Sequence, residues 1–250
     1  MNNKSTRHNE ILEILKISNY ATVESLAKEL HISPSSIRRD LSEMVASGSV
    51  IRSHGGVSLA ISENLNVSFS IRMKSNQDKK RKIAEKAIEL IKDGDVVFVD
   101  ASSTSMYLLK KLASKNGLTV ITNGIPALQY LSNFKIKVLC TGGSLDTEDR
   151  AALVGIEAIK TLQNIRANIA FISPQAIDEA GNLFDCYPDE VEVTRQMIES
   201  SMTTVALCDS TKIGKSSTFK QCSIKNLDFL VSDISLDTVY GNMFPNTKFL

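Results

Sequence analysis

Two arginines stand side by side at Arg38 and Arg39, in the segment S-P-S-S-I-R-R-D-L (33–41). Adjacent side chains on a helix point about 100° apart, so one carboxylate cannot pair with both. A guanidinium group can form two parallel hydrogen bonds to guanine in the DNA major groove, and it also binds phosphate. The pair therefore indicates a DNA-reading helix, and an ion pair of Arg39 with Glu43 one turn on is the structural alternative.

The neighbouring residues predict where this helix begins and which side is free. Ser33 is a preferred N-cap, and Pro34 is a preferred first helical residue. The apolar residues share one side of the helix: Ile37, Leu41, Met44 and Val45. Small polar residues surround Arg39 on the other side, so the helix can enter a groove. We expect DNA contacts from Ser35, Ser36, Arg38, Arg39 and Ser42.

Residues 1–58 predict a winged helix-turn-helix. Apolar residues at helical spacing indicate a first helix around 11–15 and a second that starts after the N-cap Thr22. The segment V-I-R-S-H-G-G-V (50–57) predicts two short strands that turn at the glycines, with Arg52 and His54 on this wing. One reading helix covers few base pairs, so we expect at least a dimer on double-stranded operator DNA.

From Asp95 onward, apolar strands alternate with helices. The expected strands are 96–99, 118–122, 136–140, 169–172, 204–208 and 229–232. Continuous apolar strands separated by helices are typical of a parallel sheet covered on both faces. We therefore expect a larger α/β domain over residues 77–250, joined by a linker at 59–76. The basic start of this domain, Q-D-K-K-R-K (77–82), predicts either a solvated helix start or a surface facing DNA or the other domain.

Small polar residues follow four of these strands, at 100–105, 122–124, 141–143 and 209–214. The carboxyl ends of parallel strands meet at one edge of the sheet, where backbone N–H groups can bind an anion. One serine-rich turn is more often a helix cap, but four such turns predict a shared pocket. The expected ligand-binding residues are Asp100, Ser102, Ser103, Thr104, Thr122, Asn123, Gly142, Gly143 and Lys212.

The composition excludes several other classes of protein. The 250 residues are 42% hydrophobic and 23% charged with a net charge of +1, as in an ordinary soluble protein whose basic surfaces are local. The sequence has neither a membrane-length apolar run nor a signal peptide, so we expect a cytoplasmic protein without a membrane partner. We expect no metal and no cofactor, because C-x-x-C pairs and the glycine-rich nucleotide motifs are absent. Cys140 and Cys208 end apolar strands and are expected to be small buried hydrophobes, with a thiol near the pocket as the alternative.

The motifs R-x-x-x-I-L (7–12), S-L-A-K-E-L-H-I-S-x-x-S-I-R-R-D-L (25–41) and G-x-V-I-R-S-H-G-G-V (48–57) resemble the DNA-binding domain of DeoR-family bacterial regulators. Two later stretches, A-F-I-x-x-x-A-I-D (170–178) and E-V-x-V-T-R-Q-M-I (190–198), resemble the family's sensor domain, which is similar in fold to ribose-5-phosphate isomerase. The resemblance implies a repressor of a carbohydrate operon that binds a phosphorylated sugar and forms dimers or tetramers. The family usually has glycine at the position of Ser102 and where Ser173-Pro174 and Ala176 stand, so we expect a narrower pocket here.

The alternative function is a sugar-phosphate isomerase fused to a DNA-binding domain. Asp178 and Glu179 would supply the acid that such an enzyme needs. However, no lysine occurs between Asn168 and Thr211, and no histidine follows His54. We therefore expect ligand binding without catalysis.

Overall fold

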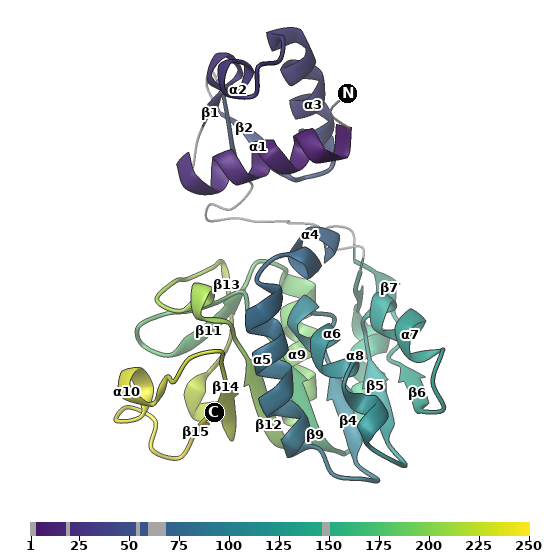
Figure 1. Cartoon of the computed structure of the whole chain (residues 1–250). Coiled ribbons are helices and arrows are strands. Elements are labelled where there is room, and N and C mark those ends of the chain that lie inside the picture. The colour runs from purple at the N-terminus through teal and green to yellow at the C-terminus, as the bar shows by residue number, and fades with distance from the viewer. Residues whose placement is uncertain (1–3, 19–20, 54–55, 60–68, 147–150) are drawn as a thin grey trace. The chain divides into compact units, whose positions relative to one another are not determined.

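The computed structural model of the chain describes residues 4–18, 21–53, 56–59, 69–146 and 151–250. The chain divides into two compact units, Met1–Arg72 and Met73–Leu250. Helix α4 (Phe69–Lys74) lies across the boundary between them, inside the range expected to be a linker. Figure 1 shows the elements of both units.

The first unit contains three helices and a three-stranded sheet, which confirms the predicted winged helix-turn-helix. Helices α1 (Lys4–Ser18), α2 (Val23–Glu29) and α3 (Pro34–Ala46) precede a hairpin of β2 (Val50–Ser53) and β3 (Gly56–Leu59). Strand β3 also pairs with β1 (Ala21–Thr22).

Both predicted N-caps of this unit are present. Thr22 and Ser25 form a capping box at α2, with bonds of 3.0 and 2.9 Å between the side chain of each and the backbone N–H of the other. Ser33 caps α3 by accepting a bond from Ser36 N at 3.3 Å. A capping bond satisfies one of the N–H groups that a helix start leaves free, which is why these residues mark the starts so reliably.

The second unit is built on a seven-stranded parallel sheet with the strand order β15-β14-β12-β9-β4-β5-β6. Its strands are β4 (Val96–Val99), β5 (Thr119–Thr122), β6 (Lys137–Cys140), β9 (Ala167–Ile172), β12 (Ser201–Leu207), β14 (Phe229–Val231) and β15 (Lys248–Phe249). All six predicted strands are confirmed. The seventh, β15, is too short to show a strand pattern in the sequence.

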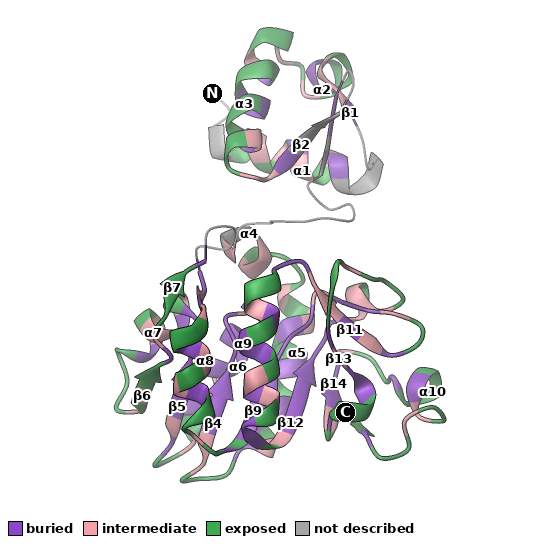
Figure 2. Cartoon of the chain, turned by 180° about the vertical axis from the view of Figure 1, so that it is seen from behind, coloured by how far each residue is buried: buried purple, intermediate pink, exposed green. Residues whose placement is uncertain are grey.

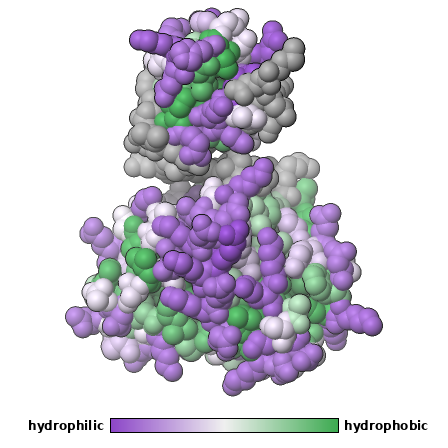
Figure 3. All heavy atoms as spheres, in the orientation of Figure 1, coloured by the Kyte–Doolittle hydropathy of each residue, from purple (hydrophilic) through white to green (hydrophobic). Residues whose placement is uncertain are grey.

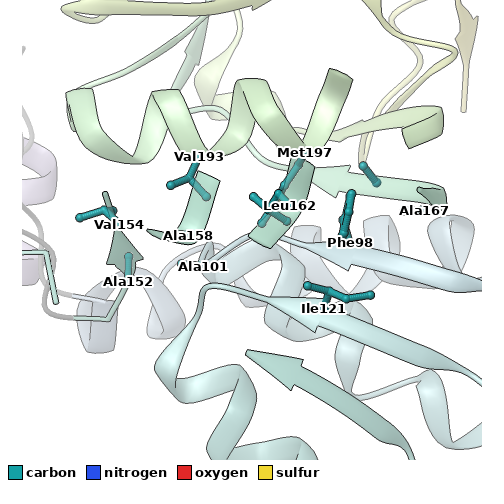
Figure 4. Packing of buried hydrophobic residues seen from close by; sticks show 11 residues of the cluster. Phe98, Ala101, Ile121, Ala152, Val154, Ala158, Leu162, Ala167, Val193 and Met197 are labelled. Atoms are coloured by element: carbon teal, nitrogen blue, oxygen red, sulfur yellow. The ribbon is translucent and has the colours of Figure 1, made fainter. Parts of the chain in front are cut away.

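Helices cover both faces of this sheet, as the continuous apolar strands predicted. In the opposite views of Figures 1 and 2, α5 (Gln77–Ala87) and α6 (Ser103–Leu109) lie over one face, and α8 (Ile156–Gln163) and α9 (Pro188–Glu199) lie over the other. Helix α7 (Ile125–Leu131) follows β5. Figure 4 shows Phe98 and Ile121 of the sheet against Leu162 and Met197 of α8 and α9. Apolar contact on both faces removes most of the sheet from water.

Smaller elements complete the second unit. An antiparallel sheet contains β10 (Ala176–Ile177), β11 (Asn182–Asp185) and β13 (Phe219–Ser223), and β7 (Ser144–Leu145) pairs with β8 (Leu153–Val154). Helix α10 (Asp237–Tyr240) and short 3-10 turns, including Ser210–Lys212, lie among them. These strands were not predicted from the sequence, because most of them are too short to carry a periodic signal.

The cysteine prediction is correct at one position and wrong at the other. Cys208 is buried, and burial raises the pKa of its thiol to about 12. Cys140 is exposed, as are most residues of β6, the edge strand that pairs only with β5 among the described strands. No helix in the described ranges is long and apolar enough to cross a bilayer. The described His, Cys, Asp and Glu side chains also form no cluster that could hold a metal ion.

Candidate functional sites

The reading helix α3 presents both predicted arginines to solvent. Its buried side consists of Ile37, Asp40, Leu41 and Met44. Arg38 and Arg39 are both exposed, and no ion pair or hydrogen bond engages Arg39 within the described part of the chain. The alternative pair with Glu43 is therefore not formed. Arg38 Nη2 lies 3.4 Å from Glu24 Oε1, an exposed pair of about 0–1 kcal/mol that a DNA phosphate can displace.

The predicted serines lie around the start and the exposed side of this helix. Ser33 Oγ lies 3.0 Å from Ser35 Oγ and donates a hydrogen bond to Ser36 Oγ at 3.0 Å. Ser42 Oγ donates a bond to Arg38 O at 2.8 Å. A hydroxyl can donate one hydrogen bond and accept two, so these bonds are compatible with a further contact to DNA. On the wing, Arg52 pairs with Val57 across the hairpin, and His54 lies outside the described residues.

The strand order of the second unit reverses at β4, which lies between β9 and β5. Open α/β sheets bind ligands at the carboxyl ends of the strands at such a reversal. Here Asp100 joins the turn after β4 to the turn after β9. Its Oδ2 accepts a bond from Ser173 N at 2.6 Å, and its Oδ1 accepts bonds from Ser105 Oγ at 2.5 Å and Ser102 N at 3.2 Å. Burial raises the pKa of Asp100, and these bonds oppose that rise. The carboxylate therefore holds the turns together rather than facing outward.

The side chain of Ser102 bonds within its own helix. Its Oγ accepts a hydrogen bond from Ser105 N at 3.1 Å and donates one to Ser105 Oγ at 3.0 Å. The φ angle of −74° is one that any residue can adopt, so this turn does not need a glycine. The serine thus replaces the family's glycine without backbone strain.

The basic run at the start of α5 divides into two sets: Arg81 and Lys82 are exposed, as expected for a solvated helix start, whereas Lys79 and Lys80 bond to other elements of the second unit. Lys80 is only 3% exposed, and its ammonium donates a hydrogen bond to Ser103 Oγ at 3.0 Å. Lys79 Nζ donates to Ser210 Oγ at 2.6 Å. Asn76 Nδ2 reaches Thr211 Oγ1 at 3.1 Å. The start of this helix is thus bound to two of the predicted ligand-binding turns, and Figure 3 shows hydrophilic side chains over the solvent-facing side of α5.

Sequence reasoning missed Lys80, although a signal for it exists. Lys80 shares the buried stripe of α5 with Ile83, Ala84 and Ala87, at a spacing of three and four residues. A lysine on an apolar stripe is costly unless its ammonium has a partner, and this marks it as a candidate site residue.

Lys212 lies in the turn after β12 and reaches the turn after β9. Its Nζ donates hydrogen bonds to Pro174 O at 2.6 Å and Ser173 Oγ at 3.1 Å. Burial raises the pKa of the nearby Asp209, but the charges of Lys212 and Lys80 together with hydrogen bonds from Thr211 hold it below its ordinary value. Both ammonium groups therefore act on the same strand-end turn, after β12.

Two predicted residues bury polar oxygen atoms for which the described structure provides no partner: Oγ1 of Thr104 and Oδ1 of Asn123. Both residues are at most 2% exposed. Asn123 Nδ2 donates to Leu153 O at 3.1 Å, and Thr122 Oγ1 accepts a bond from Gly124 N at 3.0 Å. A buried polar atom without a partner is costly, so these two oxygens suit a bound ligand or water.

Gly142 and Gly143 follow β6, which lies two strands away from β4. Within the described residues, no hydrogen bond connects these glycines to the turns around Asp100. Gly143 has a φ of +103°, and a Cβ there would lie 2.3 Å from Val154 O, so close packing against β8 requires glycine. Hydrogen bonds thus join the turns after β4, β9 and β12. The turn after β6 is joined instead to the turn after β5, where Thr141 N donates to Thr122 O at 3.2 Å.

The residues of the enzyme alternative have structural roles. Asp178 accepts hydrogen bonds from Asn182 N at 2.7 Å and Asn182 Nδ2 at 2.9 Å, which stabilises the turn between β10 and β11. Arg195 donates to the backbone oxygens of Gln221 and Lys220. These contacts do not form an acid–base pair with an oxyanion-stabilising cation, as isomerisation would need.

Family comparisons agree with both units. A model of the DeoR-like helix-turn-helix domain matches residues 7–63, and one of the DeoR C-terminal sensor domain matches residues 75–234. The chain belongs to the DeoR family. It is a DNA-binding transcriptional regulator, and the family assignment does not support the isomerase alternative.

Several family members are similar over nearly their whole length. The regulator GolR of Listeria innocua is 36% identical over 96% of this chain and 94% of its own length. The repressor GlcR of Bacillus subtilis is 33% identical over 89% and 86%, and the glycerol-3-phosphate regulon repressor of Escherichia coli is 27% identical over 92% and 91%. Among solved structures, ribose-5-phosphate isomerase A of Methanocaldococcus jannaschii aligns with a TM-score of 0.42 and 19% identity, over 56% of this chain and 55% of the isomerase.

Proposed function

We propose that this regulator is a cytoplasmic repressor of a carbohydrate operon and that a phosphorylated sugar binds its second unit. The observation that supports the ligand class is the placement of two ammonium groups, Lys80 and Lys212, on the strand-end turns around β4. Ammonium groups are common ligands of phosphate. The glycerol-3-phosphate regulon repressor, which is similar over 92% of this chain, has a phosphorylated compound in its name.

The rest of the proposed site supplies groups for the sugar. The oxygens Thr104 Oγ1 and Asn123 Oδ1 are buried without partners in the described structure and can accept hydrogen bonds from sugar hydroxyls. The same two turns, after β4 and after β5, also contain Ser102, Ser103 and Thr122. Asp100 holds the turn after β4 in place. Gly142 and Gly143 border this site on the β6 side only if the ligand extends past β5.

We propose that the start of α5 carries the response to the ligand. Asn76, Lys79 and Lys80 bond to the turns at Thr211, Ser210 and Ser103. Tyr107 Oη also donates a hydrogen bond to Met73 O at 3.0 Å, at the first residue of the second unit. A ligand that takes over Lys80 or moves these turns changes how residues 73–80 are held, and these residues lead directly to the DNA-binding unit. A ligand alters DNA affinity only if it binds the DNA-bound and the free conformations with different affinity, and the changed contacts of residues 73–80 would supply this difference.

Fluorescence anisotropy tests the proposal on an operator that the protein selects from a random oligonucleotide pool. The labelled operator is titrated with protein at two salt concentrations, with and without a panel of sugar phosphates, their unphosphorylated sugars and inorganic phosphate. We expect salt-dependent, sequence-selective binding that one phosphorylated sugar weakens and its free sugar does not. If a ligand strengthens selective binding, the protein is an activator or a repressor that requires a co-repressor. If no phosphorylated compound changes binding, the proposed ligand class is wrong.

We propose a homodimer or tetramer on a two-fold symmetric operator. The argument is geometric: one α3 helix reads only one half-site, and two half-sites spaced by a helical turn need two reading helices. Light scattering of the free protein and of its complex with the selected operator tests this stoichiometry. A single copy on a site without internal symmetry would contradict it.

A further inference from the structure

The reading helix α3 carries a buried carboxylate immediately after its two arginines. Asp40 is 1% exposed and belongs to the side of α3 that packs inward, with Ile37, Leu41 and Met44. A negative charge in a unit that must approach DNA phosphates is unfavourable, and a buried ionised carboxylate requires a partner. Neither apolar packing nor contact with DNA phosphates therefore explains why a carboxylate is buried at position 40.

The partner of Asp40 comes from helix α1. Arg7 Nε donates a hydrogen bond to Asp40 Oδ2 at 2.5 Å, and Arg7 Nη2 donates one to Asp40 Oδ1 at 2.8 Å. His8 Nε2 lies 3.5 Å from Asp40 Oδ1. Burial raises the pKa of Asp40, but the hydrogen bonds and charge of Arg7 bring it below its ordinary value, and the same pairing raises the pKa of Arg7. The pair is therefore ionised at neutral pH, and its two hydrogen bonds make it bidentate.

Two parallel hydrogen bonds restrict rotation in a way that apolar contacts do not. The packing of Ile37, Leu41 and Met44 holds α3 against the core but is non-directional. A bidentate pair between planar groups fixes both distance and angle. Asp40 follows Arg38 and Arg39 directly, so a rotation of α3 about its axis that broke this pair would also swing both arginines across the groove.

We propose that Arg7 and Asp40 are positioning residues that set the rotation of α3 and thereby determine which base Arg39 reaches. The proposal concerns the free and DNA-bound first unit only, and it does not depend on the ligand of the second unit. It predicts that loss of the bidentate geometry reduces discrimination between operator and random DNA. Phosphate contacts, which are less directional, are expected to persist.

The test must separate this role from one in stability alone, because breaking a buried ion pair destabilises a fold. Arg7→Lys keeps the charge but cannot form two parallel bonds. The double substitution of Arg7→Met with Asp40→Leu removes both charges and leaves apolar groups, a change that folds commonly tolerate. Glu24→Gln is the matched control, because it removes the exposed pair between α2 and Arg38 on the same reading helix.

Each variant of the full chain is assayed by anisotropy on the selected operator and on random DNA of equal length, below the onset of unfolding seen by circular dichroism. We expect Arg7→Lys and the double variant to be folded, with an operator-to-random affinity ratio reduced about tenfold and an unchanged salt dependence on random DNA. The control is expected to keep the wild-type ratio. A wild-type ratio in the folded Arg7→Lys or double variant would reduce the pair to a structural role and overturn the proposal. An equal loss of affinity for both DNAs would also overturn it.

Discussion

The ammonium of Lys80 donates a 3.0 Å hydrogen bond to the hydroxyl of Ser103, and thereby joins the first helix of the sensor unit to the turn after β4. Lys80 is nearly fully buried, and its positive charge helps to lower the pKa of Asp209 in the turn after β12. One side chain thus links the chain segment next to the DNA-binding unit with two turns of the proposed ligand site.

Replacement of Lys80 by methionine is expected to abolish the ligand response while preserving the fold. Methionine keeps the apolar stem on the buried stripe of α5 but removes the ammonium that would bind a phosphate. We expect at least a tenfold weaker response to the effective sugar phosphate, measured by anisotropy on the selected operator. The exposed Lys82→Met is the control, and a wild-type dose–response in Lys80→Met would exclude Lys80 from the site.

Lys212→Ala is expected to bind the operator normally and to lose the ligand response. Its ammonium bonds to the turn after β9, and a phosphate at the strand reversal would compete for the same donor. Anisotropy on the operator with increasing sugar phosphate measures both properties. The matched control is Lys215→Ala, which alters an exposed lysine three residues along the chain. An unchanged dose–response in Lys212→Ala would place this lysine outside the pocket.

Asn76→Ala is expected to separate ligand binding from its effect on DNA. Asn76 reaches Thr211 but carries no charge that a phosphate needs. Calorimetry should therefore show near-wild-type ligand affinity, whereas the ligand-induced change in operator affinity should shrink severalfold. The neighbouring Gln77→Ala controls for a general effect on the start of the helix. Equal coupling in wild type and Asn76→Ala would rule out this route.

Arg39→Ala is expected to weaken specific operator binding by about 1–3 kcal/mol, as the loss of one bidentate base contact should. Binding to random DNA should change less, because phosphate contacts supply most of it. Anisotropy on both DNAs at the same salt concentration measures the difference. Equal operator affinity for the wild type and the variant would show that Arg39 does not read a base.

The ion pair of Asp40 predicts how the stability of the first unit depends on pH. Because pairing with Arg7 outweighs burial and lowers the pKa of Asp40, folding is stabilised above the ordinary carboxyl pKa of about 4, and this stabilisation is lost as pH falls through the lower folded pKa. The groups that face the pair are His8, Glu10 and Glu43. Asp40→Asn should cost about 3 kcal/mol at pH 7 and progressively less below about pH 4.

Thermal unfolding of the wild type and Asp40→Asn between pH 3 and pH 7 measures that gap. The exposed pair of Arg38 and Glu24 offers the comparison, because Glu24→Gln should shift the unfolding temperature little at any pH. A gap that stays constant down to pH 3 would contradict an ionised Asp40 as its cause.

Much of the fold follows from local patterns in the sequence. Ser33-Pro34 and Thr22 mark helix starts because a side-chain oxygen and a proline each satisfy the geometry of a first turn, whatever the rest of the chain does. Five of the six apolar strands are recognisable because burial on both faces leaves no polar alternation, whereas β6 is apolar although its residues are exposed or half-buried. The exposed Arg39 and the family motifs follow from the same local information, so the DNA-binding unit was predictable almost in full.

The contents of the ligand site were less predictable, because they depend on which strands become neighbours. Asp100 and Ser173 meet only because β4 lies beside β9, and Gly142 with Gly143 are separated from them because β6 takes the edge. Cys140, on the same edge strand, is exposed. Lys80 and Arg7 acquire their partners from residues 23 and 33 positions away. Local patterns report which side chains are buried and where helices begin, whereas the partner of a buried charge is determined by the order in which distant elements pack.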